Sequence, residues 1–222
     1  MKEHYQPAEA VTASQVLDTT RALIGEHWRY LGLVGAAIIV VYSLFDWSGN
    51  TSIALLAQIA VFTFVQYKVT ERLLADRLPG GIGSARYRSM FGSGLLSGLG
   101  TMFGLVFFLL PGVFLMARWS IAAPLVVAEN MSSVRSLGES WERTRKSSGP
   151  LFLVFLLIGA AYFVAVIMGV GMGSWASLGN NFIQSVVGNL VSVAISLFSW
   201  VLAVAVYRCL APDQGGLQDV FA

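Results

Sequence analysis

The chain has 222 residues, of which 56% are hydrophobic and only 12% are charged, with a net charge of +2. Soluble domains carry about a quarter of their residues as charged side chains, so this composition favours lipid as the solvent. A charge so near balance gives no basis for a nucleic-acid partner. The single cysteine excludes an internal disulfide and a multi-cysteine metal site. We therefore expect an all-α, polytopic membrane helical bundle.

The N-terminal region lacks a basic stretch leading into a short apolar core, so no cleaved signal peptide is predicted. Residues 1–11 are predicted to be a disordered tail and residues 12–29 an amphipathic helix. Thr12 and Gln15 have the spacing of a capping box at its start. The helix places apolar and charged residues on opposite sides: Val16, Leu17, Leu23, Ile24 and Trp28 against Asp18, Arg21, Glu26 and Arg29.

About six transmembrane segments are predicted within one integral membrane domain, residues 12–210, which a C-terminal tail follows over residues 211–222. Each segment approaches the roughly 20 apolar residues that cross a bilayer core of about 30 Å. The predicted spans are 30–46, 51–67, 93–110, 112–128, 150–172 and 182–207.

The stretch 93–128 is too long for one span, and Pro111-Gly112 interrupts it near its middle. It forms either two short helices joined at Pro111-Gly112 or one kinked span with an interfacial piece. The two short helices either cross the membrane twice or form a re-entrant hairpin. Basic residues decide between these alternatives, since they concentrate in 2–29, 68–88 and 135–146 and at Arg208. Two crossings or a re-entrant hairpin place all of them on one side of the membrane. The predicted topology therefore has both termini in the cytoplasm.

A second amphipathic helix is predicted over residues 132–147, before Pro150. Opposite charges lie four residues apart in it, as in Glu139/Arg143, which stabilises an exposed helix. Its apolar stripe consists of Val134, Leu137 and Trp141. Such a helix either lies in the headgroup plane or forms a cytoplasmic cap packed on the bundle.

The residues for catalysis are sparse. His4 and His27 are the two histidines of the chain, so neither an HExxH zinc motif nor a Ser/His/Asp or Cys/His set can be assembled. Neighbouring acids such as Glu139 and Glu142 lie on a charged helical face, where solvation explains them. We therefore predict no metal, no cofactor and a non-catalytic role, with a membrane-embedded lipid-modifying enzyme as the weakest hypothesis.

Transport of a small solute is the main alternative function. It calls for acids buried within spans, or for broken helices in two repeated halves. No internal repeat is detected, and the strongly polar side chains deep in spans are Gln58, Gln184 and Asn189.

Glycine pairs occur at the small-xxx-small spacing that lets membrane helices approach closely, as in Gly94/Gly98 and Gly100/Gly104. We interpret them as internal packing, with dimerisation as the alternative.

Arg118 is a permanent cation inside an apolar run, and a charge at mid-bilayer costs about 2.5 kcal/mol or more. Counted from Pro111-Gly112, it would lie roughly a third of the way in from the outer face, beside Trp119. Pro124 is predicted to bend the same helix by freeing a backbone carbonyl.

Two interpretations of Arg118 stay open: a structural ion pair or snorkelled side chain, or a binding site for a lipid phosphate or another anion. Glu129 lies too far along the helix to pair with it, whereas Asp46, at the outer end of the first span, is the better candidate partner.

The segment "FLLPGVFLMARWSIAAPLVVAENMSSVRSLGESWERTRKSSGPLFLVFLL" resembles the family named for the membrane domain of glycerophosphoryl diester phosphodiesterase, together with related uncharacterised bacterial inner-membrane proteins. The resemblance is strongest over residues 95–157. Its matching positions are Pro111, Gly112, Arg118, Pro124, Glu129, Ser140 and Trp141.

The resemblance implies a bacterial cytoplasmic-membrane protein of about six helices. It does not imply the phosphodiesterase activity, because the chain has too few histidines for that catalytic domain. A non-catalytic module that binds lipid headgroups or assists a partner is the preferred hypothesis. The expected partners are membrane lipids and either another membrane protein or a second copy of the chain.

Overall fold

The computed structural model describes residues 11–47, 51–77, 85–107, 109–175 and 181–211. The predicted tails, with His4, lie almost wholly outside these ranges. Within them every regular element is a helix, which confirms the all-α fold. The elements are α1 (Ala13–Trp47), α2 (Thr51–Leu73), the short 3₁₀ helix η1 (Ala75–Arg77), α3 (Ala85–Phe107), α4 (Leu109–Arg118), α5 (Ala122–Glu129), α6 (Ser133–Arg143), α7 (Ser148–Trp175) and α8 (Asn181–Leu210).

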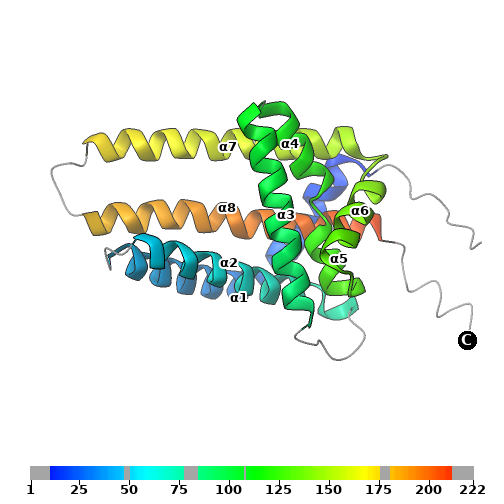
Figure 1. Ribbon diagram of the computed structural model, residues 1–222, viewed down its shortest axis with the longest axis horizontal. Helices are drawn as coiled ribbons and strands as arrows, with labels where there is room; N and C mark the ends of the chain where they lie inside the picture. Colours follow the sequence, from blue (N-terminus) through cyan, green and yellow to red (C-terminus); the bar gives the residue numbers. More distant parts are fainter. Residues whose placement is uncertain (1–10, 48–50, 78–84, 108, 176–180, 212–222) are drawn as a thin grey trace, which may run out of the picture.

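Two directions dominate the arrangement of the helices. Helices α1, α2, α7 and α8 run along the long axis of the molecule, whereas α3 runs across it (Figure 1). Helices α4, α5 and α6 gather towards the end where α1 begins and α8 finishes. We call this the basic end, because it carries Arg77, Arg143, Arg145, Lys146 and Arg208.

Helix α1 combines the predicted amphipathic helix and the first predicted span. The capping box is confirmed, since the Thr12 backbone N–H donates to Gln15 Oε1 at 2.9 Å and the Gln15 N–H donates to Thr12 Oγ1 at 3.3 Å. The helix is kinked at His27, whose backbone angles are φ −112° and ψ 15°. The amphipathic part therefore continues into the long part through a bend.

The joint between α3 and α4 is displaced from its predicted place at Pro111-Gly112. Helix α3 ends at Phe107 and α4 begins at Leu109. Pro111 falls in the first turn of α4, where a missing N–H leaves no hydrogen bond unmade. Gly112 instead allows α4 to approach α3 closely, because a Cβ added to Gly104 of α3 would lie 2.8 Å from the Gly112 Cα.

The glycine pairs differ in what they contact. A Cβ on Gly100 would meet the Trp119 ring at 2.6 Å, so Gly100 and Gly104 pack α3 against α4, which confirms internal packing there. Nothing lies within 4 Å of a Cβ on Gly94 or Gly98.

The protein is a membrane protein by the composition of its helices. In the described ranges three segments are long and apolar enough to cross a membrane: Ala13–Asp46, Leu110–Glu129 and Val186–Leu210. A shorter apolar helix covers Ser148–Ala161. Six crossings stay a prediction. Helix α3 runs across the four long helices rather than parallel to them.

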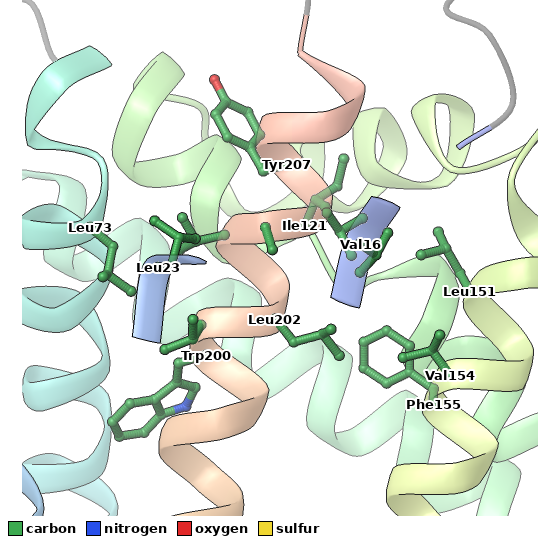
Figure 2. Close-up of a cluster of buried hydrophobic side chains, with 14 of the residues drawn as sticks. Val16, Leu23, Leu73, Ile121, Leu151, Val154, Phe155, Trp200, Leu202 and Tyr207 are labelled. Atoms are coloured by element: carbon green, nitrogen blue, oxygen red, sulfur yellow. The ribbon is translucent and has the colours of Figure 1, made fainter. Parts of the chain in front are cut away.

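The hydrophobic core lies towards the basic end, where α1, α2, α7 and α8 meet the turn before α5. Figure 2 shows side chains converging there: Val16, Leu23, Leu73, Ile121, Leu151, Val154, Phe155, Trp200, Leu202 and Tyr207. Val16 and Leu23 are buried, whereas Leu17 and Trp28 of the predicted apolar side are exposed. The first part of α1 is therefore packed into the bundle.

Candidate functional site at the basic end

Arg118 lies at the junction of α4, α6 and α7, and its side chain is 3% exposed. Its Nη1 donates to Ser148 Oγ, at the start of α7, at 2.8 Å. The structure thus places Arg118 with α6 and the first turn of α7, at the basic end, and its depth below the outer face stays a prediction. Helix α3 runs across the bundle and α4 folds back beside it, so that Arg118, at the end of α4, lies against α6 and α7.

Two aromatic rings pack against the Arg118 guanidinium. Its Cζ lies 4.3 Å from the centroid of the Trp141 ring on α6 and 5.9 Å from that of Phe114 on α4. Trp119, predicted to neighbour the arginine, stands 6.5 Å from Trp141, centroid to centroid. Stacking on aromatic faces stabilises a cation that has left water.

The predicted bend near Pro124 is present. Helix α4 ends at Arg118, a turn follows, and α5 begins at Ala122 with Pro124 in its first turn. The carbonyl of Arg118 thereby lacks an intrahelical donor. Ser140 Oγ of α6 donates to it at 2.8 Å, and Thr144 Oγ1 lies 3.2 Å away.

Helix α6 packs on α3 and α5 as a cap, the second of the two predicted alternatives. Its buried face is not the apolar stripe but a row of hydroxyl side chains, Ser136, Ser140 and Thr144, all fully buried. Val134 of the predicted stripe is 73% exposed. Small hydroxyl side chains suit this face because they let α6 approach closely and because two of them can donate hydrogen bonds to the Arg118 carbonyl.

Glu129 belongs to a charged network beside the junction. Arg143 donates to both of its carboxylate oxygens, one at 2.7 Å, and Tyr207 Oη donates to it at 3.0 Å. The predicted pair of Glu139 and Arg143 is confirmed at 2.7 Å. Burial lowers the pKa of Arg143, but the hydrogen bonds and charges of Glu129 and Glu139 outweigh it and raise that pKa. Its stabilising charge is therefore complete at neutral pH and is lost only above the ordinary arginine pKa.

Asp46 does not meet Arg118, so the predicted pair is not formed. Asp46 accepts hydrogen bonds from Gln58 Nε2 of α2 at 3.1 Å and from Asn189 Nδ2 of α8 at 2.9 Å. Asn189 also donates to Ser43 at 3.2 Å. We call these residues the far cluster, since α1 ends away from the basic end (Figure 1). The side chain of Gln184 lies outside the described part.

Arg118 keeps most of its hydrogen-bonding capacity unused. A guanidinium has five N–H donors, and within the described ranges only the Nη1 bond to Ser148 is made. Nε is enclosed without a partner. In the same ranges no carboxylate lies within ion-pair distance of Arg118. Among the described residues the guanidinium therefore has no direct ion pair, although the charge of Glu142 acts on it from a greater distance, and two aromatic rings pack against it.

An apolar groove between α4 and α7 adjoins this cation. It has a volume of about 460 Å³ and is lined by Leu110, Pro111, Phe114, Ser148, Gly149 and Phe152. Phe114 and Ser148, which form this lining, also contact the Arg118 guanidinium. The groove therefore joins an apolar surface to a positive charge.

Comparison with protein families identifies the family of the chain. The family described as the membrane domain of glycerophosphoryl diester phosphodiesterase matches residues 95–212, more than half of the chain. The chain belongs to this family. No curated protein and no solved structure matches it significantly. The match concerns the membrane domain, so the family name carries no phosphodiesterase activity to these residues.

Residues of the membrane-domain motif come together at the junction. Arg118, Ser140 and Trp141 contact one another, and Pro124 and Glu129 lie on the adjoining α5.

Sequence reasoning missed Ser148, Arg143 and Tyr207 as members of the site. The four-residue spacing of Ser136, Ser140 and Thr144 could have indicated the buried face of α6. No local pattern indicates Tyr207, which is 78 residues away from Glu129.

Proposed function

We propose that the chain is a non-catalytic protein of the bacterial cytoplasmic membrane, with cytoplasmic termini, that binds the phosphate of a membrane lipid at Arg118. The observation that carries this proposal is a nearly buried guanidinium that has no carboxylate within ion-pair distance in the described ranges and borders an apolar groove. A phospholipid has the matching chemistry, since its phosphate would bind Arg118 and an acyl chain would lie between α4 and α7.

The neighbouring charges support a binding role over an acid–base role. The carboxylates of Glu129 and Glu139 are engaged by Arg143, Asp76 by Arg208, and Glu71 by Lys68. Ion pairing accounts for these acids without a catalytic function. An accessory role, in which the bound lipid or the α6 cap engages a partner protein, is compatible with the same site.

The test is native mass spectrometry of the detergent-purified protein. We expect the wild type to retain an anionic phospholipid and Arg118→Gln to lose it, because hydrogen bonds to a charged group contribute about 1.5–3 kcal/mol, or roughly ten-fold to a hundred-fold in affinity. Arg118→Lys should bind at intermediate strength, since it keeps the charge but loses the planar fork. Arg145→Gln is the matched control, because Arg145 is 76% exposed.

A second variant distinguishes lipid binding in the groove from a purely structural role of Arg118. Nothing lies within 4 Å of a Cβ on Gly149, which lines the groove, so the Cβ of Gly149→Leu has open space and the rest of its side chain should occupy the groove. Gly138→Leu, equally open but on α6, is its control. If Gly149→Leu and folded Arg118→Gln both carry the wild-type lipid, the arginine is structural and the proposal fails.

A further inference from the structure

We propose that the first turn of α7 completes the Arg118 site, and that the completed site selects lipids whose phosphate is a singly charged phosphodiester. This inference rests on the proposed function, to which it adds further binding groups and the class of lipid. Its evidence is a pair of backbone N–H groups at the start of a 28-residue helix, beside a guanidinium that is 3% exposed.

The first turn of α7 has two backbone donors without an acceptor in the described ranges. A helix leaves its first N–H groups without intrahelical partners. The N–H of Ser147, the residue before α7, donates to a carbonyl of the preceding turn at 3.2 Å, and Pro150 has no N–H. Leu151 then donates to the Ser147 carbonyl at 3.0 Å. The N–H groups of Ser148 and Gly149 therefore remain.

The side chains that would normally cap these donors are bound elsewhere. A serine directly before a helix usually accepts a hydrogen bond from the second or third N–H of that helix. Ser147 Oγ instead accepts from the backbone N–H of Val11 at 2.8 Å. The Ser148 hydroxyl lies 3.1 Å from the Thr144 carbonyl and 2.7 Å from the Arg145 carbonyl, so it turns back from the helix. The positive end of the α7 dipole is thus left for an anion.

Arg118 is a second, independent sign of an anion at this turn. Its Nη1 donates to Ser148 Oγ, so the guanidinium lies against the first residue of α7. Its Nε is enclosed, whereas Nη2, which also lacks a partner in the described ranges, is not. Gly149 lines the adjoining groove without a Cβ and has open space around it, so a phosphate can approach the backbone there. One phosphate at this place accepts hydrogen bonds from Nη2 and from the two N–H groups.

The charges of these groups match a phosphodiester. The guanidinium contributes one positive charge and the end of a helix about half a charge. Glu142 and Arg145 also act on Arg118, but in opposite directions. A phosphodiester carries one negative charge, whereas a phosphomonoester carries about 1.5 to 2 at neutral pH. Excess charge in a largely buried site is costly, so the site should prefer the phosphodiester.

Lipid competition tests the class of ligand. Phosphatidylmethanol and phosphatidate with identical acyl chains differ by one methyl ester, and therefore in charge. Both are added in equal amounts to the protein in a maltoside detergent, which contains no phosphate, and native mass spectrometry compares the bound lipids. We expect the wild type to bind phosphatidylmethanol several-fold more tightly. Equal binding, or a preference for phosphatidate, overturns the selection of a phosphodiester.

Isotope labelling of the glycine nitrogens tests the contact with α7 by nuclear magnetic resonance. The Gly149 signal is identified by its loss in Gly149→Ala, whose Cβ has open space. Phosphatidylmethanol should move the Gly149 amide proton downfield, because this proton gains an acceptor. Gly138 on α6, identified in the same way, should not move. The titration uses the wild type, so it does not depend on the folding of an arginine variant.

The outcomes distinguish this inference from the proposed function. If folded Arg118→Gln loses the lipid while the wild-type Gly149 signal does not move, the Arg118 site stands and the role of α7 is overturned. Diacylglycerol with the same acyl chains can occupy the groove without a phosphate, and an equal Gly149 shift with it also overturns that role. Wild-type lipid binding by folded Arg118→Gln overturns the proposed function and this inference together.

Discussion

The basic end and the far cluster handle polar groups inside an apolar protein in different ways. At the basic end, Glu129 is bound by a guanidinium and a phenol, and Arg118 rests on aromatic rings. In the far cluster, Asp46 is held by the amide groups of Gln58 and Asn189, with no cation in its described surroundings. Full charges therefore concentrate at one end of the four long helices.

The cost of a charge in lipid explains this division. A cation at the bilayer centre costs about 2.5 kcal/mol or more, and the cost falls where headgroups and water are within reach. An ion pair is accordingly useful at the basic end, whereas neutral amides fix a carboxylate without adding a second charge. The comparison predicts that variants of the basic end change stability more than variants of the far cluster.

Removal of Glu129 should have the largest effect. Glu129→Leu leaves Arg143 without its two-oxygen partner and Tyr207 without an acceptor. Loss of one partner of a buried pair costs about 3–5 kcal/mol, and because the two side chains are 17% and 27% exposed we expect about 2–3 kcal/mol. This loss of stability is measured as the change in the free energy of unfolding in mixed detergent micelles.

The control for this variant is Glu142→Leu, which removes an acid 4.0 Å from Arg145 in an exposed pair and should change the free energy of unfolding by at most about 0.5 kcal/mol. The double variant Glu129→Leu/Arg143→Leu should be more stable than Glu129→Leu alone. Equal losses from Glu129→Leu and Glu142→Leu would contradict the network as the main support of this end.

Gly104→Ala should weaken the hairpin that brings Arg118 to the basic end. The added Cβ would meet the Gly112 backbone at 2.8 Å, and backbone atoms cannot rotate away. Overpacking of this kind costs about 1–3 kcal/mol. Thermal unfolding compares it with Gly98→Ala, which has the same chemistry with nothing within 4 Å and should be neutral or slightly stabilising. Similar melting temperatures for both would show that the hairpin is not closed at this contact.

Ser140→Ala should have a smaller effect, about 1 kcal/mol, because it removes a donor from the buried Arg118 carbonyl while Thr144 Oγ1 still lies 3.2 Å away. Adding Thr144→Val should cost more than the two single changes combined, since the carbonyl then has neither donor. Ser196→Ala on α8, whose hydroxyl serves the Ser192 carbonyl, is the control. Additive losses in the unfolding free energy would mean that the two hydroxyl groups act independently.

Local sequence signals predicted the local structure of the chain. The Thr12–Gln15 capping box, the bend near Pro124 and the pairing of Glu139 with Arg143 are all determined by residues within one or two helical turns. Such features depend on backbone geometry that neighbouring residues decide among themselves, so a single sequence contains enough information for them.

The position of Arg118 could not be predicted in the same way. It depends on the course of α3 across the bundle, and thus on close contacts between distant glycines and rings, such as Gly100 with Trp119. Counting residues from Pro111 assumed a helix that starts at the outer face. The partners of Glu129 were missed for the same reason, because Arg143 and Tyr207 reach it only through tertiary packing.

The far cluster should show the weakest coupling of all. In membrane proteins, hydrogen bonds between helices contribute about 0.6 kcal/mol on average, because the polar groups find other partners when the helices separate. A double-mutant cycle with Asp46→Leu and Asn189→Leu, read from unfolding free energies, should give a coupling near that value. The same cycle for Glu129 and Arg143 should give a coupling several times larger. If the coupling between Asp46 and Asn189 equals the coupling between Glu129 and Arg143, neutral amides bind this carboxylate as firmly as a guanidinium binds Glu129. The concentration of charge at the basic end would then have to be explained by ligand binding rather than by helix packing.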